Sequence, residues 1–391
     1  MTDDVGSKHR QGDRKRLMEA AVVLAIVLFL IFVMPSLLTA VGQSFRLKLL
    51  GRFLALAIAA LGIDLIWGYT GLLSLGHGIF FGLGGYAIGM HLKLQIPPGE
   101  LPDFMGLYGV TTLPWFWRPF YSFPFTLVAI VLIPSLLAGF VGYLVFRSRI
   151  KGVYFSILTQ AVTIIFFNFF NGQQRLVNGT NGLIDFKTLL GATVSDPKTQ
   201  FGFYCCTIIV LVAAYALCRW LTSDRFGALL IAIRDDESRT RFLGYDPAEA
   251  KTLVFAVSAA LAGIAGALYT LQSESISPRS MDVASSIEMV IWVAVGGRAT
   301  LVGAILGAVL VNFARSLLSE QFPEIWLFFQ GALFLLVVLV LPNGIIGWCR
   351  TNGHELVLKL LKRSPIATAT YPSLEQDLDV QQERRKLEPK E

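Results

Sequence analysis

Apolar runs long enough to cross a lipid bilayer recur along the whole chain, and they limit its fold more than any other feature. A helix needs roughly 20 apolar residues to span a hydrocarbon core of about 30 Å. Of the 391 residues, 54% are hydrophobic and only 15% are charged, whereas soluble domains carry about 25% charged residues. The apolar runs lie at 17–41, 53–70, 72–93, 123–146, 153–170, 201–221, 252–272, 284–296, 300–318 and 325–346. The sequence therefore predicts an all-α integral membrane protein with about ten transmembrane helices, some of them short or broken.

The distribution of basic residues predicts the topology. The polar start "MTDDVGSKHRQGDRKR" (1–16) is rich in Lys and Arg, and the positive-inside rule places it in the cytoplasm. The membrane domain at 17–348 would cross the bilayer ten times, so the tail 349–391 is expected in the cytoplasm as well. The basic loop 222–251 is expected there too. One loop disagrees, because 43–52 carries three basic residues yet falls outside by this count. The net charge of +6 lies at helix ends, so it indicates topology and not a nucleic-acid partner.

Glycine is concentrated in stretches that are otherwise apolar. The segment "GLLSLGHGIFFGLGGYAIGM" (71–90) holds seven glycines, although glycine weakens helices. Gly78 and Gly82 stand four residues apart, as do Gly303 and Gly307. Small residues at this spacing let membrane helices approach closely, so we expect these four glycines to form helix-packing surfaces.

A few polar side chains lie inside the apolar runs. Ser74 and His77 are three residues apart and would share a helix face, and Asp64 and Glu288 stand alone among apolar neighbours. Such residues face a bundle interior or a polar cavity. Each has two interpretations, a buried hydrogen-bonding or ion-pair role and a place on a solute path. They are scattered singly, without the spacing of a metal site, and we expect neither a metal nor a catalytic residue.

The loop 222–251 has the most specific local pattern. Residues 227–243 are expected to form one short helix that ends in a left-handed turn at Gly244. Asp246 then caps the next helix, with Pro247 at its first position and Glu249 completing a capping box. Six charged or turn residues of this loop are candidates for contact with a cytoplasmic partner: Arg234, Asp236, Glu237, Arg239, Gly244 and Asp246. The plainer alternative is a solvated connecting loop.

Three motifs together resemble the inner-membrane permease subunits of ATP-binding-cassette importers of the high-affinity branched-chain amino acid family. They are "WGYTGLLSLGHGIFFGLGGY", "AIRDDESRTRFLGYDPAEAKTLVFAVSAALAGIAGALY" and "VGGRATLVGAILGA", within residues 50 to 348. Further stretches are similar to the longer permease of the urea-transport branch: "LPDFM", "LPWFW", "YFSILTQAVT", "NGTNGLIDFK" and "SLLSEQFPEIW". The chain departs from the family at Asp64, where relatives have an amide or apolar residue, and at 237–239, which lacks the Glu-Ala-Ala pattern.

The resemblance implies a non-enzymatic permease subunit without a cofactor of its own, in a bacterial inner membrane. A second homologous permease, two ATPase subunits that use ATP, and an extracytoplasmic solute-binding protein would complete the importer. The similarity to the urea-transport branch implies urea as the solute, and exposed backbone together with Ser74, His77, Gln160 and Asn168 could supply it with polar contacts without net charge. Branched-chain amino acids or short-chain amides are the alternative solutes. An ion-coupled secondary transporter that uses Asp64 and Glu288 is a further alternative, and a membrane enzyme would need a clustered site that the sequence lacks.

Overall fold

The computed structural model describes residues 23–322 apart from 41, 43, 44, 98, 99 and 151, together with 325, 328, 329, 331, 332, 335, 339 and 344–348. The expected tails at 1–16 and 349–391, and most of the expected span at 325–346, lie outside the described residues. The chain divides into two compact units, Met1–Gly347 and Trp348–Glu391. Everything below concerns the first unit.

The first unit is a bundle of apolar helices, as the sequence predicts. Among the described residues, six helices are long and apolar enough to cross a membrane. They are Phe45–Gly68 (α3, Phe45–Ile63, continued by the π-helix η2, Asp64–Gly68), α6 (Phe123–Arg147), α7 (Val153–Gly172), α9 (Pro197–Thr222), α12 (Pro247–Ser273) and α14 (Leu301–Gln321). Shorter apolar helices are Val23–Leu38, which includes η1 (Phe29–Val33) and runs into α2 (Met34–Ala40), and α13 (Val283–Gly296). The glycine-rich helix α4 spans His77–Lys93.

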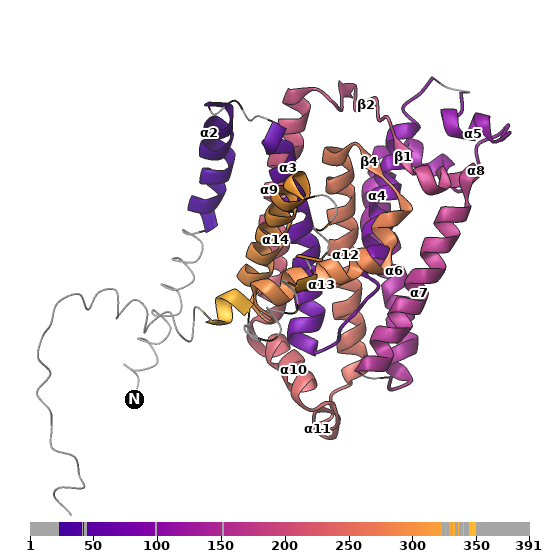
Figure 1. Cartoon of the computed structure of the whole chain (residues 1–391). Coiled ribbons are helices and arrows are strands. Elements are labelled where there is room, and N and C mark those ends of the chain that lie inside the picture. Colours follow the sequence, from indigo (N-terminus) through magenta and orange to yellow (C-terminus); the bar gives the residue numbers. More distant parts are fainter. Residues whose placement is uncertain are drawn as a thin grey trace, which may run out of the picture. The chain divides into compact units, whose positions relative to one another are not determined.

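Short elements lie at the two ends of the bundle (Figure 1). At one end are α5 (Asp103–Leu107), η3 (Arg118–Tyr121), α8 (Gln174–Val177), η4 (Gly179–Asn181) and two ladders of two-residue strands. The strand β1 (Leu183–Ile184) pairs antiparallel with β4 (Ser275–Ile276), and β2 (Thr188–Leu189) pairs with β3 (Ala192–Thr193). The opposite end carries α10 (Asp224–Asp235) and α11 (Glu237–Phe242), while η5 (Pro278–Met281) leads from β4 into α13. We call these the strand end and the α11 end.

Helix α12 runs through the middle of the bundle and packs against α3, α4 and α6. Glycines allow these close crossings, because a Cβ at Gly84 would overlap the backbone of Gly263 and one at Gly266 would overlap the carbonyl of Phe81. Backbones that approach this closely gain dispersion contacts, which replace the hydrophobic driving force that is absent in lipid. The small residues of α4 and α12 thus set the spacing of the core.

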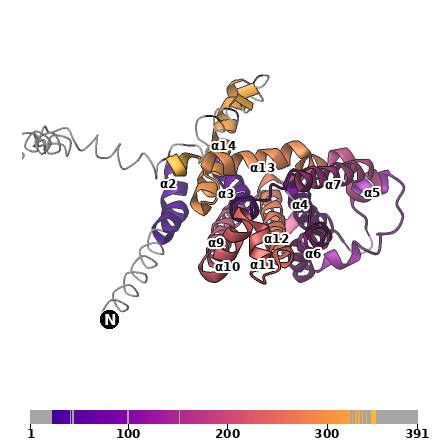
Figure 2. The same ribbon diagram turned by 90° about the horizontal axis from the view of Figure 1, so that it is seen from below.

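Helices α13 and α14 form a tight pair beside α3. A Cβ at Gly303 or Gly307 of α14 would overlap backbone atoms of α13, at Gly296 and at Trp292 respectively. Gly78, by contrast, faces backbone and side-chain oxygens of 280–286, and Gly82 faces the side chain of Met281. Viewed from below, α14, α13 and α7 follow one another along one side of the bundle (Figure 2).

Two expectations about helix boundaries are wrong. The apolar run 72–93 is not one helix, because 71–76 is non-helical and α4 begins only at His77. Its backbone groups bond to α7 instead: Ser156 Oγ donates to the Leu73 carbonyl (2.7 Å), Thr163 Oγ1 donates to that of Leu75 (3.2 Å), and the Leu75 amide donates to Thr159 Oγ1 (3.1 Å). These bonds replace the helical hydrogen bonds that 71–76 gives up.

The second correction concerns the basic stretch 43–52, which we expected to be an outer loop. Residues 45–52 are instead the first turns of α3. Lys48 forms an ion pair with Glu274, which follows α12, so a basic residue is accommodated at this end of the bundle by an acid from another element. Pairing of this kind lowers the cost of charge near a membrane.

The close contact at Gly307 generates a prediction. Replacing Gly307 with leucine should separate α14 from α13 and destabilise the protein by about 1–3 kcal/mol or more, because backbone atoms cannot yield as a flexible side chain can. We expect lower abundance and a lower melting temperature in detergent. Gly202→Leu on α9 is the matched control, since a Cβ there meets no atom within 4 Å. Equal melting temperatures for the two variants would contradict this account.

Candidate functional site

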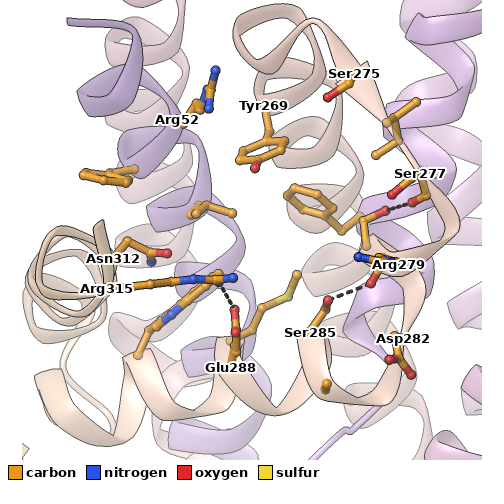
Figure 3. A pocket seen from close by; sticks show the side chains of 18 of the residues that line it. Arg52, Tyr269, Ser275, Ser277, Arg279, Asp282, Ser285, Glu288, Asn312 and Arg315 are labelled. Carbon is orange, nitrogen blue, oxygen red and sulfur yellow. Dashed lines mark hydrogen bonds and ion pairs between the residues drawn. The ribbon is translucent and has the colours of Figure 1, made fainter. Parts of the chain in front are cut away.

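A cavity of about 680 Å³ lies between α3, α13, α14 and the β4–η5 connection. Figure 3 shows the side chains around it: Arg52 and Arg315 on one side, Arg279 and Asp282 on the other, and Glu288 and Ser285 on α13 below. Apolar side chains from α3, α4, α12 and α13 complete the lining, among them Leu49, Phe53, Leu56, Phe81, Tyr269, Met289 and Trp292. The cavity is therefore bounded by apolar and by charged groups, within a bundle that is otherwise apolar.

The acidic groups of the cavity already have partners. Glu288 Oε2 accepts a hydrogen bond from Arg315 Nη1 at 2.5 Å, which links α13 to α14. Asp282 caps α13, because its Oδ1 accepts from the Val283 amide at 2.7 Å. Ser285 Oγ donates to the carbonyl of Arg279 at 2.8 Å. Arg52 differs, because its Nε is buried and has no hydrogen-bond partner among the described residues.

Of the five pathway candidates from the sequence, Glu288 is the one that lines this cavity. Gln160 is half-buried and Asn168 exposed, both on α7, and neither belongs to the lining. Ser74 is buried in the non-helical segment 71–76, so it does not share a helix face with His77 as expected. A role in the path for these four residues stays a prediction.

His77 is buried at the first turn of α4 and bonds to α12. Its Nε2 lies 2.6 Å from Ser258 Oγ, and Ser258 Oγ donates in turn to the Gly62 carbonyl of α3 at 2.5 Å. Because the single hydroxyl proton goes to Gly62, the His77 Nε2 must carry the proton that completes the chain. His77 thus connects three helices where α4 begins.

The loop 222–251 folds into two helices, not the single helix expected over 227–243. Asp236 interrupts it: its Oδ1 accepts from the amides of Ser238 (2.9 Å) and Arg239 (3.0 Å) and so caps α11. The turn that follows agrees with the sequence, because Gly244 has φ +88° and Asp246 Oδ1 accepts from the Ala248 amide at 2.9 Å. We call residues 224–246 the coupling segment.

Glu237 faces the protein, and its contact with a cytoplasmic partner stays a prediction. Its side chain is 9% exposed and pairs with Lys251 of α12 at 2.6 Å and with Arg241 at 3.2 Å. A buried ion pair with both partners present fixes orientation, since removing either charge leaves the other unpaired. Glu237 therefore holds α11 against α12, while Arg239, with a side chain that is 84% exposed, projects outward.

The tip of the coupling segment exposes large apolar side chains that the sequence analysis overlooked. Phe242 is 92% exposed, Leu243 73% and Tyr245 57%. The available signal was three large apolar residues around the turn glycine of a charged loop. Clustered apolar exposure on a polar loop is typical of a protein-interaction site.

The coupling segment is also connected to α3, and α3 to the connection between α13 and α14. Arg234 Nη1 of α10 donates to the Gly68 carbonyl at the end of η2 (2.9 Å), and Asp64 Oδ1 accepts from the Ala299 amide between α13 and α14 (2.7 Å). Arg298 adds to this contact, with Nε donating to the Trp67 carbonyl at 3.3 Å and its guanidinium 5.0 Å from the Trp67 ring centre. Burial lowers the pKa of Arg298 from its ordinary value, and the charge of Arg234 acts in the same direction.

This junction also supplies donors to carbonyls at the end of the helix formed by α3 and η2. The last four carbonyls of a helix have no partner within the helix; Arg234 bonds to that of Gly68, and that of Trp67 accepts from Arg298 and from the Gly71 amide. Elements far apart in sequence, at 64–68, 234 and 298–299, are thereby held together. These bonds join α10 to the end of α3, and the end of α3 to the connection between α13 and α14.

Comparison with known proteins gives relatives along most of the chain. The high-affinity branched-chain amino acid transport system permease protein LivM of Salmonella typhimurium is 29% identical over 320 residues, which cover 75% of this chain and 68% of LivM. The corresponding permease protein LivH of Escherichia coli K12 is 23% identical over 304 residues, covering 74% and 91%. The probable branched-chain amino acid transport permease LivM of Methanocaldococcus jannaschii is 23% identical and covers 74% and 89%. No solved structure matches the chain.

A family model points to the same relatives. The model described as the permease component of the branched-chain amino acid transport system matches residues 45–338, which include α3 through α14 and thus every element that bounds the cavity or forms the coupling segment. The chain belongs to the permease family of branched-chain amino acid transport systems.

Proposed function

We propose that this chain is one of two permease subunits of an ATP-driven importer for branched-chain amino acids in a bacterial inner membrane. The observation that carries the proposal is the junction of Asp64, Arg234 and Arg298, which ties an outward-facing coupling segment to the helices of a polar cavity. A permease driven by separate ATPases needs such a connection. In this proposal the termini and the α11 end of the chain face the cytoplasm, and its strand end contacts the solute-binding protein.

The chemistry of the cavity supports an amino acid over urea. A branched-chain amino acid is a zwitterion with an aliphatic side chain, and it needs both charged and apolar contacts. The cavity supplies arginines and acids beside Leu49, Leu56 and Trp292. Urea carries no net charge and no apolar group, so it would leave the excess charge and the apolar side chains of this lining without a matching group. The names of the relatives favour the same solute.

The partners follow from the same observations. Escherichia coli K12 has both a LivM and a LivH permease protein, and this chain is similar to each, which supports a second homologous permease. Phe242, Leu243 and Tyr245 offer an apolar surface to the ATPases. Glu288, which an ion-coupled transporter would use, is instead paired with Arg315. Asp64 accepts from the Ala299 amide through Oδ1, while its Oδ2 has no hydrogen-bond partner among the described residues.

Uptake into proteoliposomes tests the energy source and the solute. The chain is reconstituted with its second permease, its ATPases and the binding protein, and ATP is enclosed. We expect leucine uptake that needs both ATP and the ATPase subunits. Uptake that persists without these subunits and collapses with an ionophore would favour a secondary transporter, and uptake of urea in place of leucine would refute the proposed solute.

The turn at Gly244 tests mechanical coupling. A β-branched residue at φ +88° is strained, at a cost of about 1–3 kcal/mol, so Gly244→Val should distort the coupling segment without touching the cavity. We expect the amount of leucine moved per ATP hydrolysed to fall. Gly244→Asn is the control, because asparagine tolerates the left-handed region better. An unchanged ratio in the valine variant would show that the loop is only a connector.

The apolar tip tests the docking of the ATPases. Phe242→Asp should place a carboxylate in an apolar interface and reduce co-purification of the ATPase subunits, because a charge buried there has no partner. Leu190→Asp is the matched control: Leu190 is 70% exposed and lies at the strand end. Equal recovery of the ATPases with both variants would exclude Phe242 from the interface.

A further inference from the structure

The positive charge of Arg52 is not neutralised within the described part of the chain. Arg52 lies in the second turn of α3 and lines the cavity (Figure 3), where its Nε is buried without a hydrogen-bond partner. No carboxylate among the described residues forms an ion pair with it, whereas Lys48, one turn earlier, pairs with Glu274. A permanently charged group inside a membrane protein is costly unless something neutralises it, and it usually marks a functional site.

The other basic groups of the cavity are less available. Arg315 is already bound to Glu288, and Arg279 is an exposed residue on the far side of the cavity in Figure 3. Of the described lining acids, Glu288 is paired with Arg315 and Asp282 caps α13. The lining arginines outnumber these acids, so the cavity has an excess of positive charge before a solute enters. An anionic group on the solute would offset this excess.

The surroundings of Arg52 define which anion fits. Leu49, Phe53 and Leu56 lie on the same helix at the spacing of one face, and all three line the cavity beside Arg52. A guanidinium binds a carboxylate through two parallel hydrogen bonds. The guanidinium and the adjacent apolar side chains together fit a ligand whose carboxylate lies a few bonds from an aliphatic group.

We propose that Arg52 binds the α-carboxylate of the transported amino acid while Leu49, Phe53 and Leu56 contact its aliphatic side chain. This inference rests on the proposed function and adds to it the residue that selects an amino acid over uncharged solutes. Arg52 is thus a specificity-determining residue, and the bound solute pairs with a charge that the described residues leave unpaired.

The test measures binding to the cavity without the binding protein, whose own selectivity would otherwise dominate. The complex of this chain with its second permease and its ATPases is placed in lipid nanodiscs, and bound radiolabelled leucine is displaced by unlabelled leucine, leucinamide or urea. Leucinamide keeps the ammonium and the side chain and lacks the carboxylate. In the wild type we expect leucine to compete about tenfold or more better than leucinamide.

Arg52→Gln should remove this preference, so that leucine and leucinamide compete equally, and Arg52→Lys should retain part of it because the positive charge remains. Arg46→Gln is the matched control, since Arg46 lies on the same helix but outside the lining of this cavity. Co-purification of all subunits checks that each variant assembles. The charge-retaining lysine variant keeps the test informative if glutamine impairs folding.

The outcomes separate this proposal from the proposed function. If Arg52→Gln discriminates against leucinamide as the wild type does, or if the wild type shows no preference or no leucine binding, the role of Arg52 is refuted while leucine uptake into proteoliposomes can still stand. If urea displaces leucine as well as leucine itself does, selection by charge is refuted. If the wild type takes up urea and not leucine, the proposed function fails first.

Discussion

The arrangement of the helices depends on hydrogen bonds to backbone groups that are not in a helix but lie inside the apolar bundle. Between α3 and α4 the segment 71–76 gives up its helical bonds, and Ser156, Thr159 and Thr163 of α7 replace them. Without these hydroxyls the cost of burying unpaired amides and carbonyls would exclude the break. The break allows α4 to begin inside the bundle at His77, where Ser258 connects it to α3 and α12.

The same solution recurs at the α11 end with charged side chains. The carbonyls at the end of η2 accept from Arg234 and Arg298, and the connection between α13 and α14 donates to Asp64. Hydroxyl groups hydrogen-bond to the non-helical segment 71–76, and charged side chains hydrogen-bond to the backbone at the junction of α3, α10 and the α13–α14 connection. The charged junction includes a residue of α10, so the helix that projects from the bundle is bonded to the helices that bound the cavity. A permease moved by external subunits requires this type of connection.

The cavity combines charge with apolar surface in a way that matches an aliphatic zwitterion. Glu288 and Arg315 join α13 to α14, and the Nε of Arg52 on α3 has no hydrogen-bond partner among the described residues. In a medium of low polarity an unpaired charge strongly favours binding of its counter-charge, which is the basis of the selectivity proposed for Arg52. The close glycine contacts of α14 with α13 keep the wall that carries Glu288 and Arg315 in place.

The sequence by itself determined the class of protein, most spans and the turn chemistry of the coupling segment, because these depend on local apolar runs and on caps such as Gly244 and Asp246. It did not reveal that α4 starts at His77, that 45–52 is helical, that Asp236 splits the coupling helix or that Glu237 faces inward, because each depends on a partner from another element. Leu73 needs Ser156, Lys48 needs Glu274, and Glu237 needs Lys251. The cavity is likewise tertiary: its arginines and acids come from α3, α14 and the segment from η5 into α13, and only packing brings these charges around one cavity.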